Sequence, residues 1–369
     1  MKYPILLSII TFLLLLCGCR NSSTTHEANC ADSIITEARL LSITPGDGYT
    51  LVTIKNPWKE GVLHQYVLVP TDSTMPATLP EGTVVRTPLR QALVYSSVHT
   101  SIMKELGMFS SVKGVCDVQF FTDPDVLQGV KDGKIVDCGS SMTPTVEKVI
   151  EMQPDAIMLS PYQDATYGQI TKLNIPIIEC ADYMEFTPLG RAEWVKFYGL
   201  LLGREREAQD IFNQVSKSYN DIKQQAAQAT SRPMVLTEMV ISGVWNVPGG
   251  QSYMARILQD AGGNYPWADD KSTGSLNLDF NQVLAVAQQA DYWLIKSFYI
   301  HSYDDLKANH ALNSQFKAFK ERKVYICDTN ETRLFEQFPF HPDRLLKDYY
   351  RIFHPQDSVH IENTYFKPL

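Results

Sequence analysis

The sequence predicts an α/β protein in which two similar lobes are joined by one long helix, with a ligand cleft between the lobes. The main observation is an internal repeat. Residues 146–159 and 280–295 each read as a short amphipathic helix, a turn that carries Asp, and an apolar strand. A helix that stops at Gly precedes each copy, over residues 96–107 and 249–263. Between the copies, residues 188–230 show no strand pattern. Two lobes built alike imply a cleft, and clefts bind ligands.

The first residues are predicted to be an export signal that belongs to neither lobe. Residues 1–18 combine Lys2 with an apolar run that is shorter than a membrane span requires. The segment Leu16-Cys17-Gly18-Cys19 resembles the bacterial lipoprotein box, which implies that Cys19 is acylated and becomes the new N-terminus. An ordinary signal peptide with an incidental cysteine is the alternative. The polar residues 19–37 would then form a flexible tether.

Composition excludes some function classes. The 369 residues correspond to about two domains. A formal net charge of −8 and the absence of a basic run argue against a nucleic-acid partner. Cys116, Cys138 and Cys180 lie in or beside apolar runs, so we expect them to be small buried side chains. The cysteine spacing supports neither a disulfide nor a zinc site.

The N-terminal lobe is predicted to span residues 38–203, with an additional β segment over 38–84. That segment shows alternating strand patterns around a Pro-Gly turn, and a Pro-rich stretch follows it. Alternating strands and helices then begin at residues 91–95 and continue to residues 175–179. This alternation favours a mostly parallel sheet that is flanked by helices.

Two helices and a second αβ region follow. Residues 190–202 read as one helix that stops at Gly203, and residues 204–230 read as the connecting helix, on the order of 39 Å long. Its apolar residues fall at steps of three and four, which marks one buried stripe. The C-terminal lobe is predicted over residues 231–369, with a last helix at 342–353.

Several phrases occur in an order and spacing that is similar to one known family. They are Ser97-Val98-His99-Thr100, Thr145 to Ala156, Leu201 to Glu205, Gly249 to Gly263, Phe316 to Cys327, and His341 to Pro355. Over residues 85–357 the chain resembles the substrate-binding proteins of ABC importers for iron-siderophores and cobalamin. The resemblance implies two Rossmann-like lobes, a stiff connecting helix and limited closure of the lobes around a ligand.

The same resemblance implies a function. We expect a lipid-anchored substrate-binding component that captures a ferric siderophore or a cobalamin-type chelate outside the cytoplasm. It would deliver this chelate to an inner-membrane permease with its ATPase, as a monomer without a cofactor of its own. A haem- or metal-binding lipoprotein of the same fold is the alternative. An extracytoplasmic enzyme is a further one, although no GxSxG or P-loop motif supports it.

The family docks on its permease through an acidic side chain on each lobe. The first such position matches Glu147, whereas the second falls on Asn281. Asp279 could take over the second role, or it only caps the helix that it precedes. For Glu147 the alternative is a solvated residue in the first turn of a helix, which the helix dipole favours.

Ligand contacts are expected in the loops at the carboxyl ends of the strands. These loops are residues 95–100, 139–144, 160–167, 244–253, 297–303 and 329–340. They are rich in aromatic residues, which suits a large and partly apolar chelate. The candidates for ligand contact are Tyr95, His99, Tyr162, Trp245, Tyr253, Tyr299 and Arg333.

Three of these candidates carry specific expectations. Trp245 and Tyr299 follow predicted strand ends outside the apolar register, while Trp293 lies inside a strand and is expected in the core. Arg333, together with Lys296, could meet an anionic ligand group. His99 could be an axial ligand to cobalt or iron, or a histidine at a helix start with local hydrogen bonds.

Overall fold

Residues 34–357 and 363–369 are described in a computed structural model of the chain. They belong to the unit Ser33–Leu369. The predicted export signal, the lipidation residue Cys19 and most of the predicted tether lie outside the described residues. In the described part, none of the helices combines the length and the apolar character of a membrane span.

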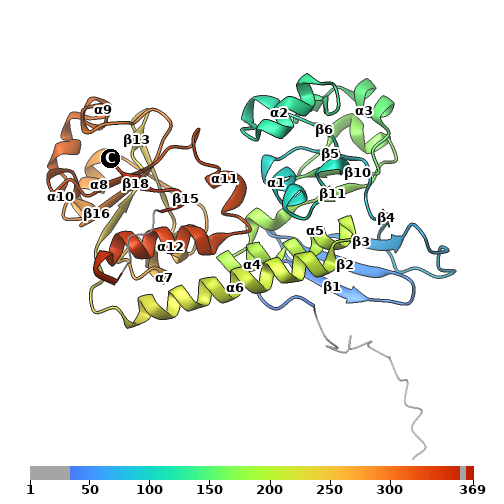
Figure 1. The fold of residues 1–369 in the computed structure, drawn as a ribbon, viewed down its shortest axis with the longest axis horizontal. Helices are drawn as coiled ribbons and strands as arrows, with labels where there is room; N and C mark the ends of the chain where they lie inside the picture. Colours follow the sequence, from blue (N-terminus) through green and yellow to red (C-terminus); the bar gives the residue numbers. More distant parts are fainter. Residues whose placement is uncertain (1–33, 358–362) are drawn as a thin grey trace, which may run out of the picture. The chain divides into compact units, whose positions relative to one another are not determined.

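The N-terminal lobe is built on a parallel five-stranded sheet in the order β11-β10-β5-β6-β7 (Figure 1). Its strands are β5 (Ala92–Val94), β6 (Val112–Val115), β7 (Val136–Asp137), β10 (Ala156–Leu159) and β11 (Ile177–Glu179). The helices are α1 (Ser97–Glu105), α2 (Pro124–Lys131) and α3 (Val146–Met152), and a small hairpin is formed by β8 (Gly139–Ser140) and β9 (Thr143–Pro144). Both β5 and β10 are buried at every residue, as expected for parallel strands covered on two faces. The predicted αβ alternation is confirmed.

The C-terminal lobe has a mixed sheet in the order β12-β16-β17-β18 and a second, antiparallel sheet in the order β13-β14-β15. The strands are β12 (Val235–Thr237), β13 (Val240–Ile241), β14 (Val244–Pro248), β15 (Ser275–Leu278), β16 (Tyr292–Lys296), β17 (Val324–Cys327) and β18 (Lys367–Pro368). The helices are α7 (Tyr253–Asp260), α8 (Phe280–Ala287), α9 (Tyr303–Asn309), α10 (Lys317–Lys320), α11 (Leu334–Gln337) and α12 (Pro342–Phe353). The antiparallel sheet was not predicted.

The internal repeat has a counterpart in strand pairing. In the N-terminal lobe β10 pairs with β5 and β11, and in the C-terminal lobe β16 pairs in parallel with β12 and β17. The repeated Asp residues also do the same work. Asp155 Oδ2 accepts hydrogen bonds from the backbone N–H groups of Arg90 and Gln91, and Asp291 Oδ2 accepts one from Met234. Each carboxylate therefore fixes the start of the neighbouring strand.

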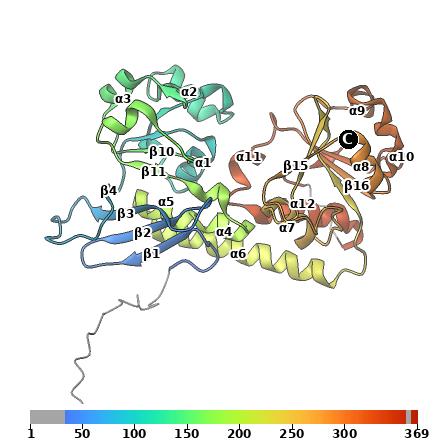
Figure 2. The ribbon, with the colours of Figure 1, turned by 180° about the vertical axis from the view of Figure 1, so that it is seen from behind.

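Three helices connect the lobes. The predicted helix over 190–202 is divided into α4 (Pro188–Glu193) and α5 (Val195–Leu202), and the connecting helix α6 spans Glu205–Gln228. Gly203 ends α5 in the left-handed conformation, at φ +63°, which glycine adopts without strain. Figures 1 and 2 show α6 running from α5 toward α7 and α12, and it packs against all three. Its 24 residues are about 36 Å long.

The additional β segment forms a separate four-stranded sheet in the order β1-β2-β3-β4. Its strands are β1 (Leu41–Pro45), β2 (Thr50–Lys55), β3 (Val62–Pro70) and β4 (Thr83–Thr87). The fourth strand pairs with β3 in parallel, which the sequence did not predict. Tyr66 joins this sheet to the edge strand β11, because its hydroxyl donates to the Ile177 carbonyl and accepts from the Glu179 N–H. The segment thus extends the N-terminal lobe at the β11 edge.

The start of the described chain is bound to α4. Glu193 is fully buried, and its carboxylate accepts hydrogen bonds from the backbone N–H groups of Thr36, Glu37 and Ala38. Lys196 Nζ lies 2.7 Å from the same carboxylate. Burial alone would raise the pKa of Glu193, but the bond from Lys196 and the backbone donors outweigh it, so the pKa lies below its usual value.

Candidate ligand site between the lobes

Large apolar side chains are exposed at the carboxyl ends of strands in both lobes. The exposed side chains in the N-terminal lobe are Phe120, Met142 and Tyr162, at 72%, 73% and 44% exposure. Those in the C-terminal lobe are Phe298, Tyr299 and Phe335, at 57%, 41% and 51%. Exposed apolar side chains that lie together on one edge of a protein often mark a surface that binds a ligand or a partner. Both lobes therefore present apolar surface where α/β proteins bind ligands.

One cavity is lined by both lobes. The N-terminal lobe contributes Ser97 at the start of α1, together with Phe120 and Thr122, and the C-terminal lobe contributes Arg333 and Phe335 beside α11. Its volume is about 220 Å³. Pockets for drug-sized ligands are roughly 300–1,000 Å³. A large chelate would therefore need the lobes to move apart before it enters.

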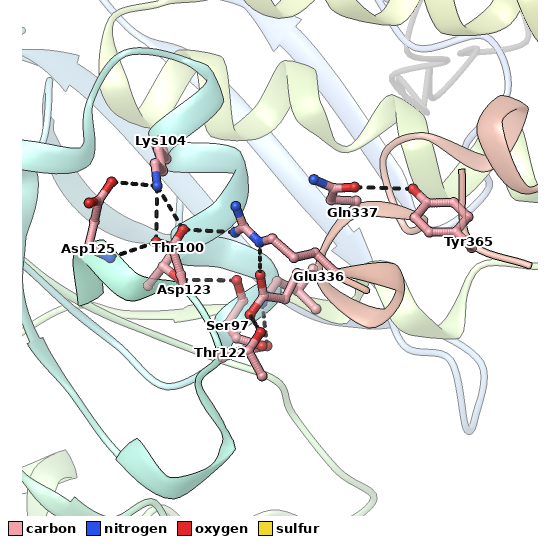
Figure 3. Close-up of polar contacts among 12 residues, drawn as sticks. Ser97, Thr100, Lys104, Thr122, Asp123, Asp125, Glu336, Gln337 and Tyr365 are labelled. Atoms are coloured by element: carbon pink, nitrogen blue, oxygen red, sulfur yellow. Dashed lines mark hydrogen bonds and ion pairs between the residues drawn. The ribbon is translucent and has the colours of Figure 1, made fainter. Parts of the chain in front are cut away.

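An ion-pair network crosses between the lobes at this cavity (Figure 3). Arg333 Nη2 lies 2.8 Å from Asp123 Oδ2, and Arg333 Nε lies 2.6 Å from Glu336 Oε2. The Thr122 hydroxyl of the N-terminal lobe donates to Glu336 of the C-terminal lobe, and Lys104 Nζ lies 3.0 Å from Asp123. We call the Arg333–Asp123 and Thr122–Glu336 contacts the interlobe latch. Because Arg333 already has two carboxylate partners, a ligand anion would have to compete with them.

The latch depends on an ionised Asp123, whose side chain is 3% exposed. Burial acts to raise the pKa of Asp123. The hydrogen bonds from Lys104 and from the Asp125 N–H, with the charge of Arg333, outweigh burial and hold the pKa below its usual value. The pKa of Glu105 is also lowered, because the bond from His341 of the other lobe outweighs burial.

Acid is expected to loosen the lobes. Since the folded pKa of Asp123 is depressed, its contribution is present above about pH 4 and is lost as pH falls through the folded value. We expect the radius of gyration from small-angle scattering to rise below about pH 4 while far-UV circular dichroism stays constant. The Asp123→Asn variant should be expanded already at pH 7. A folded wild-type protein whose radius is constant down to pH 3 would contradict the latch.

His99 lies in a buried network rather than at the cavity. It is 1% exposed, and its Nε2 is 3.1 Å from Asp182 Oδ1. Asp182 also accepts bonds from Tyr198 and Arg191, and Arg191 Nη1 donates to the Tyr253 hydroxyl of the other lobe at 3.0 Å. The burial of His99 argues against ligand contact, and its hydrogen-bond partner Asp182 is 83 positions away, so its hydrogen bond is long-range and not local as the alternative expected.

The charges of this network reinforce one another. Burial would lower the pKa of His99, but Cys180 and the Asp182 carboxylate raise it above its usual value. Burial would raise the pKa of Asp182, but the bond from His99 and the charge of Arg191 lower it. The network therefore holds the buried Asp182 carboxylate between the Arg191 guanidinium and the His99 imidazole.

Trp245 is a second correction. It is 0% exposed and packs in the core of the C-terminal lobe, with its ring centroid 5.7 Å from that of Trp293. Its indole N–H donates to the Thr237 carbonyl. The sequence placed Trp245 in a loop, whereas it lies in β14, whose alternating burial points it inward. Trp293 is buried as expected, and Lys296 pairs with Glu238.

The remaining aromatic candidates divide by exposure. Tyr299 is exposed beside Phe298, and Tyr162 is exposed on the loop after β10. Tyr95 is half-buried, and within the described residues its buried hydroxyl has no hydrogen-bond partner. Tyr253 stacks on Phe338, with ring centroids 5.9 Å apart. Tyr299 and Tyr162 remain the accessible candidates of this group.

The docking candidates are all exposed but differ in their contacts. Glu147 and Asn281 are each the second residue of the repeated helices α3 and α8. Asp279 is the N-cap of α8, where its side chain accepts from the Gln282 N–H in a capping box. Asp279 therefore has the capping role that the sequence offered as its alternative.

Phe120 and Met142 were missed as candidates. Met142 lies inside a predicted ligand loop, and Phe120 follows the predicted strand at 112–116, so their position was available as a signal. Asp123 had no local signal, since it is 210 positions from its partner Arg333, whereas Glu336 is three positions from Arg333.

Known proteins resemble this chain in sequence and in fold. The profile of the periplasmic binding protein family matches residues 98–331. The chain belongs to the periplasmic binding protein family. An uncharacterized lipoprotein of Methanocaldococcus jannaschii is 27% identical over 74% of this chain and 67% of its own length. The petrobactin-binding protein of Bacillus subtilis is 27% identical over 42% of this chain and 48% of its own length.

Among solved structures, a periplasmic haem-binding protein of Pseudomonas aeruginosa shares the fold. The TM-score is 0.57 at 15% identity, and the match covers 75% of this chain and 97% of that chain. The periplasmic binding protein family consists of substrate-binding transport proteins rather than enzymes, which confirms the predicted class. Membership also confirms the predicted two-lobe α/β fold.

Proposed function

We propose that the protein captures a metal chelate of the ferric-siderophore or cobalamin type outside the cytoplasm and passes it to an ABC permease. The observation that carries the proposal is the set of exposed apolar side chains at the strand ends of both lobes. Such side chains can cover the apolar body of a chelate when the lobes close. The petrobactin-binding relative is consistent with this ligand class.

Ligand identity can be tested directly on the purified chain. Tryptophan fluorescence would be followed while a ferric catecholate, a ferric hydroxamate, cobalamin and haem are added separately. We expect saturable 1:1 quenching by one iron or cobalt chelate and weaker binding of the metal-free siderophore. Selective tight binding of haem would move the protein to the alternative ligand class. No binding of any chelate, together with turnover of an ester substrate, would overturn the proposal.

Lipid anchoring through Cys19 is part of the proposal. The segment Leu16-Cys17-Gly18-Cys19 supports it, and so does the lipoprotein relative. In cells given radiolabelled palmitate, the full-length chain should be labelled and sediment with membranes. The Cys19→Ser variant should lose both properties, while Cys30→Ser should keep them. Equal labelling of wild type and Cys19→Ser would exclude this anchor.

Permease docking is proposed for the exposed Glu147. It lies exposed in the first turn of α3, where the helix dipole also favours a carboxylate, and it is accessible to a basic partner surface. We expect Glu147→Ala to reduce chelate uptake several-fold without changing ligand affinity. Asn281→Ala, at the matching position of α8, is the control and should have little effect. Equal loss of ligand affinity in the Glu147 variant would contradict a docking role.

A further inference from the structure

A second cavity lies outside the interlobe site, between the additional sheet and the N-terminal lobe. Trp58 and Val62 from the β2–β3 hairpin form one wall, and Tyr162 and Ala165 from the loop after β10 form another. Its volume is about 300 Å³, at the lower end of the roughly 300–1,000 Å³ of small-molecule pockets. The hairpin precedes residue 98, where the match to the family begins. This cavity therefore uses a part of the chain that the matched family region does not contain.

Glu179, at the end of β11, lines the cavity and is only 8% exposed. Its Oε1 accepts a bond from the Tyr167 hydroxyl at 2.6 Å, and its Oε2 lies 3.1 Å from His64 Nδ1. Among the described residues, its one ion-pair partner is this His64, which carries a charge only when protonated, and no permanently charged lysine or arginine pairs with it. A carboxylate has about four acceptor positions, so two donors leave capacity for a ligand. A buried carboxylate without a fixed cation favours binding of a positive group.

The walls favour a cation that carries an apolar body. Tyr162 is 44% exposed and Val62 is 53% exposed, so both side chains can still gain contacts. Aromatic faces such as those of Trp58 and Tyr162 attract ammonium groups by cation–π interaction. The two charged residues at the rim, Lys59 and Asp164, have opposite signs and leave Glu179 as the excess charge.

We propose that this cavity binds a small organic cation, a protonated amine with an apolar body. The ammonium group donates to Glu179, and the apolar body lies between Trp58 and Tyr162. None of these three residues lines the interlobe cavity. Tyr162 also belongs to the exposed side chains that support the proposed function, whereas Trp58 and Glu179 do not, so the amine site is distinguished by those two residues and adds a second binding activity.

A matched set of probes tests the charge preference. Isothermal titration calorimetry at pH 7 would compare 2-phenylethylamine, 2-phenylethanol and phenylacetate on the mature protein. They share a phenyl ring and a short chain but are cationic, neutral and anionic. We expect 1:1 binding of the amine, at least tenfold weaker binding of the alcohol and none of the acid. No binding of the amine, or equal binding of all three, would overturn the proposal.

Variants place the binding in this cavity. Glu179→Gln keeps the size of the side chain and removes its charge, so amine affinity should fall at least tenfold. Trp58→Ala, on the exposed hairpin, should weaken binding of the amine several-fold. If Glu179→Gln does not fold, this variant tests whether the amine binds in this cavity. Phe335 lines the interlobe cavity and not this one. Phe335→Ala is therefore the control, and its affinity for the amine should be unchanged. An amine affinity that falls in Phe335→Ala but not in Glu179→Gln would place binding between the lobes and refute the site.

Discussion

The Asp182→Ala variant is expected to lose about 3–5 kcal/mol of the free energy of unfolding, the range for breaking a buried ion pair. Asp182 is 1% exposed and accepts hydrogen bonds from His99, Arg191 and Tyr198. Removing its carboxylate leaves the buried guanidinium of Arg191 without a counter-charge and the His99 and Tyr198 donors without an acceptor. Chemical unfolding in urea, followed by circular dichroism, measures the loss as a lower midpoint at an unchanged slope.

The matched control is Asp210→Ala, which removes a carboxylate from the exposed face of α6. Surface substitutions of this kind change stability by about 0.5 kcal/mol or less.

The variant His99→Gln should remove the pH dependence of stability that His99 gives to the wild type. Because the folded pKa of His99 is raised, its contribution is complete below about pH 6.5 and declines as pH rises toward the folded value. A loss below 1 kcal/mol in Asp182→Ala would show that the network has little energetic weight.

The second large effect is expected on ligand affinity. Phe120 and Phe335 line the same cavity from opposite lobes and are 72% and 51% exposed. Phe120→Ala and Phe335→Ala should each weaken binding of the chelate about tenfold. The double variant should weaken it about 100-fold, which corresponds to a loss of about 2.7 kcal/mol of binding free energy. Since both side chains are exposed, unfolding midpoints should stay near the wild-type value. Fluorescence titration with the chelate identified in the binding panel measures the affinities.

Phe186→Ala is the control for exposed aromatics, because Phe186 is 38% exposed but does not line the interlobe cavity. Its affinity for the chelate should match the wild type. If both phenylalanine variants bind as tightly as the wild type, the ligand does not lie between these strand ends. If the double variant loses more binding free energy than the two single variants together, the two rings contact the same part of the ligand.

Much of the fold was predictable because its signals are local. The apolar stripe of α6 predicted each of its ends to within two residues of the observed Glu205–Gln228, and the repeat predicted helices and strands that pair alike in both lobes. The strand β4 was missed, because prolines on both sides of it suggested a loop and its pairing with β3 is parallel and distant. The antiparallel sheet was missed because β13 has only two residues.

The site was less predictable, because it depends on contacts between distant residues. Tyr162 and Tyr299 could be placed at strand ends and are exposed there. Trp245 was misplaced together with the undetected β14, since a strand assignment would have turned it toward the core. The charge of Arg333 suggested an anionic ligand. The spacing of Arg333 and Glu336, three positions apart, is that of a local ion pair, whereas Asp123 is 210 positions away and only the fold brings it to Arg333.

The binding of residues 36–38 to Glu193 has a mechanical consequence. The chain enters the described structure at α4, which packs against α5, α6 and α7, rather than at the loops that carry the exposed apolar side chains. A pull on the N-terminal side would therefore be borne by the helical frame between the lobes. Opening and closing can then proceed with little work against that load. If Cys19 carries the proposed lipid anchor, its pull reaches the lobes through this frame and not through the loops that carry the exposed apolar side chains.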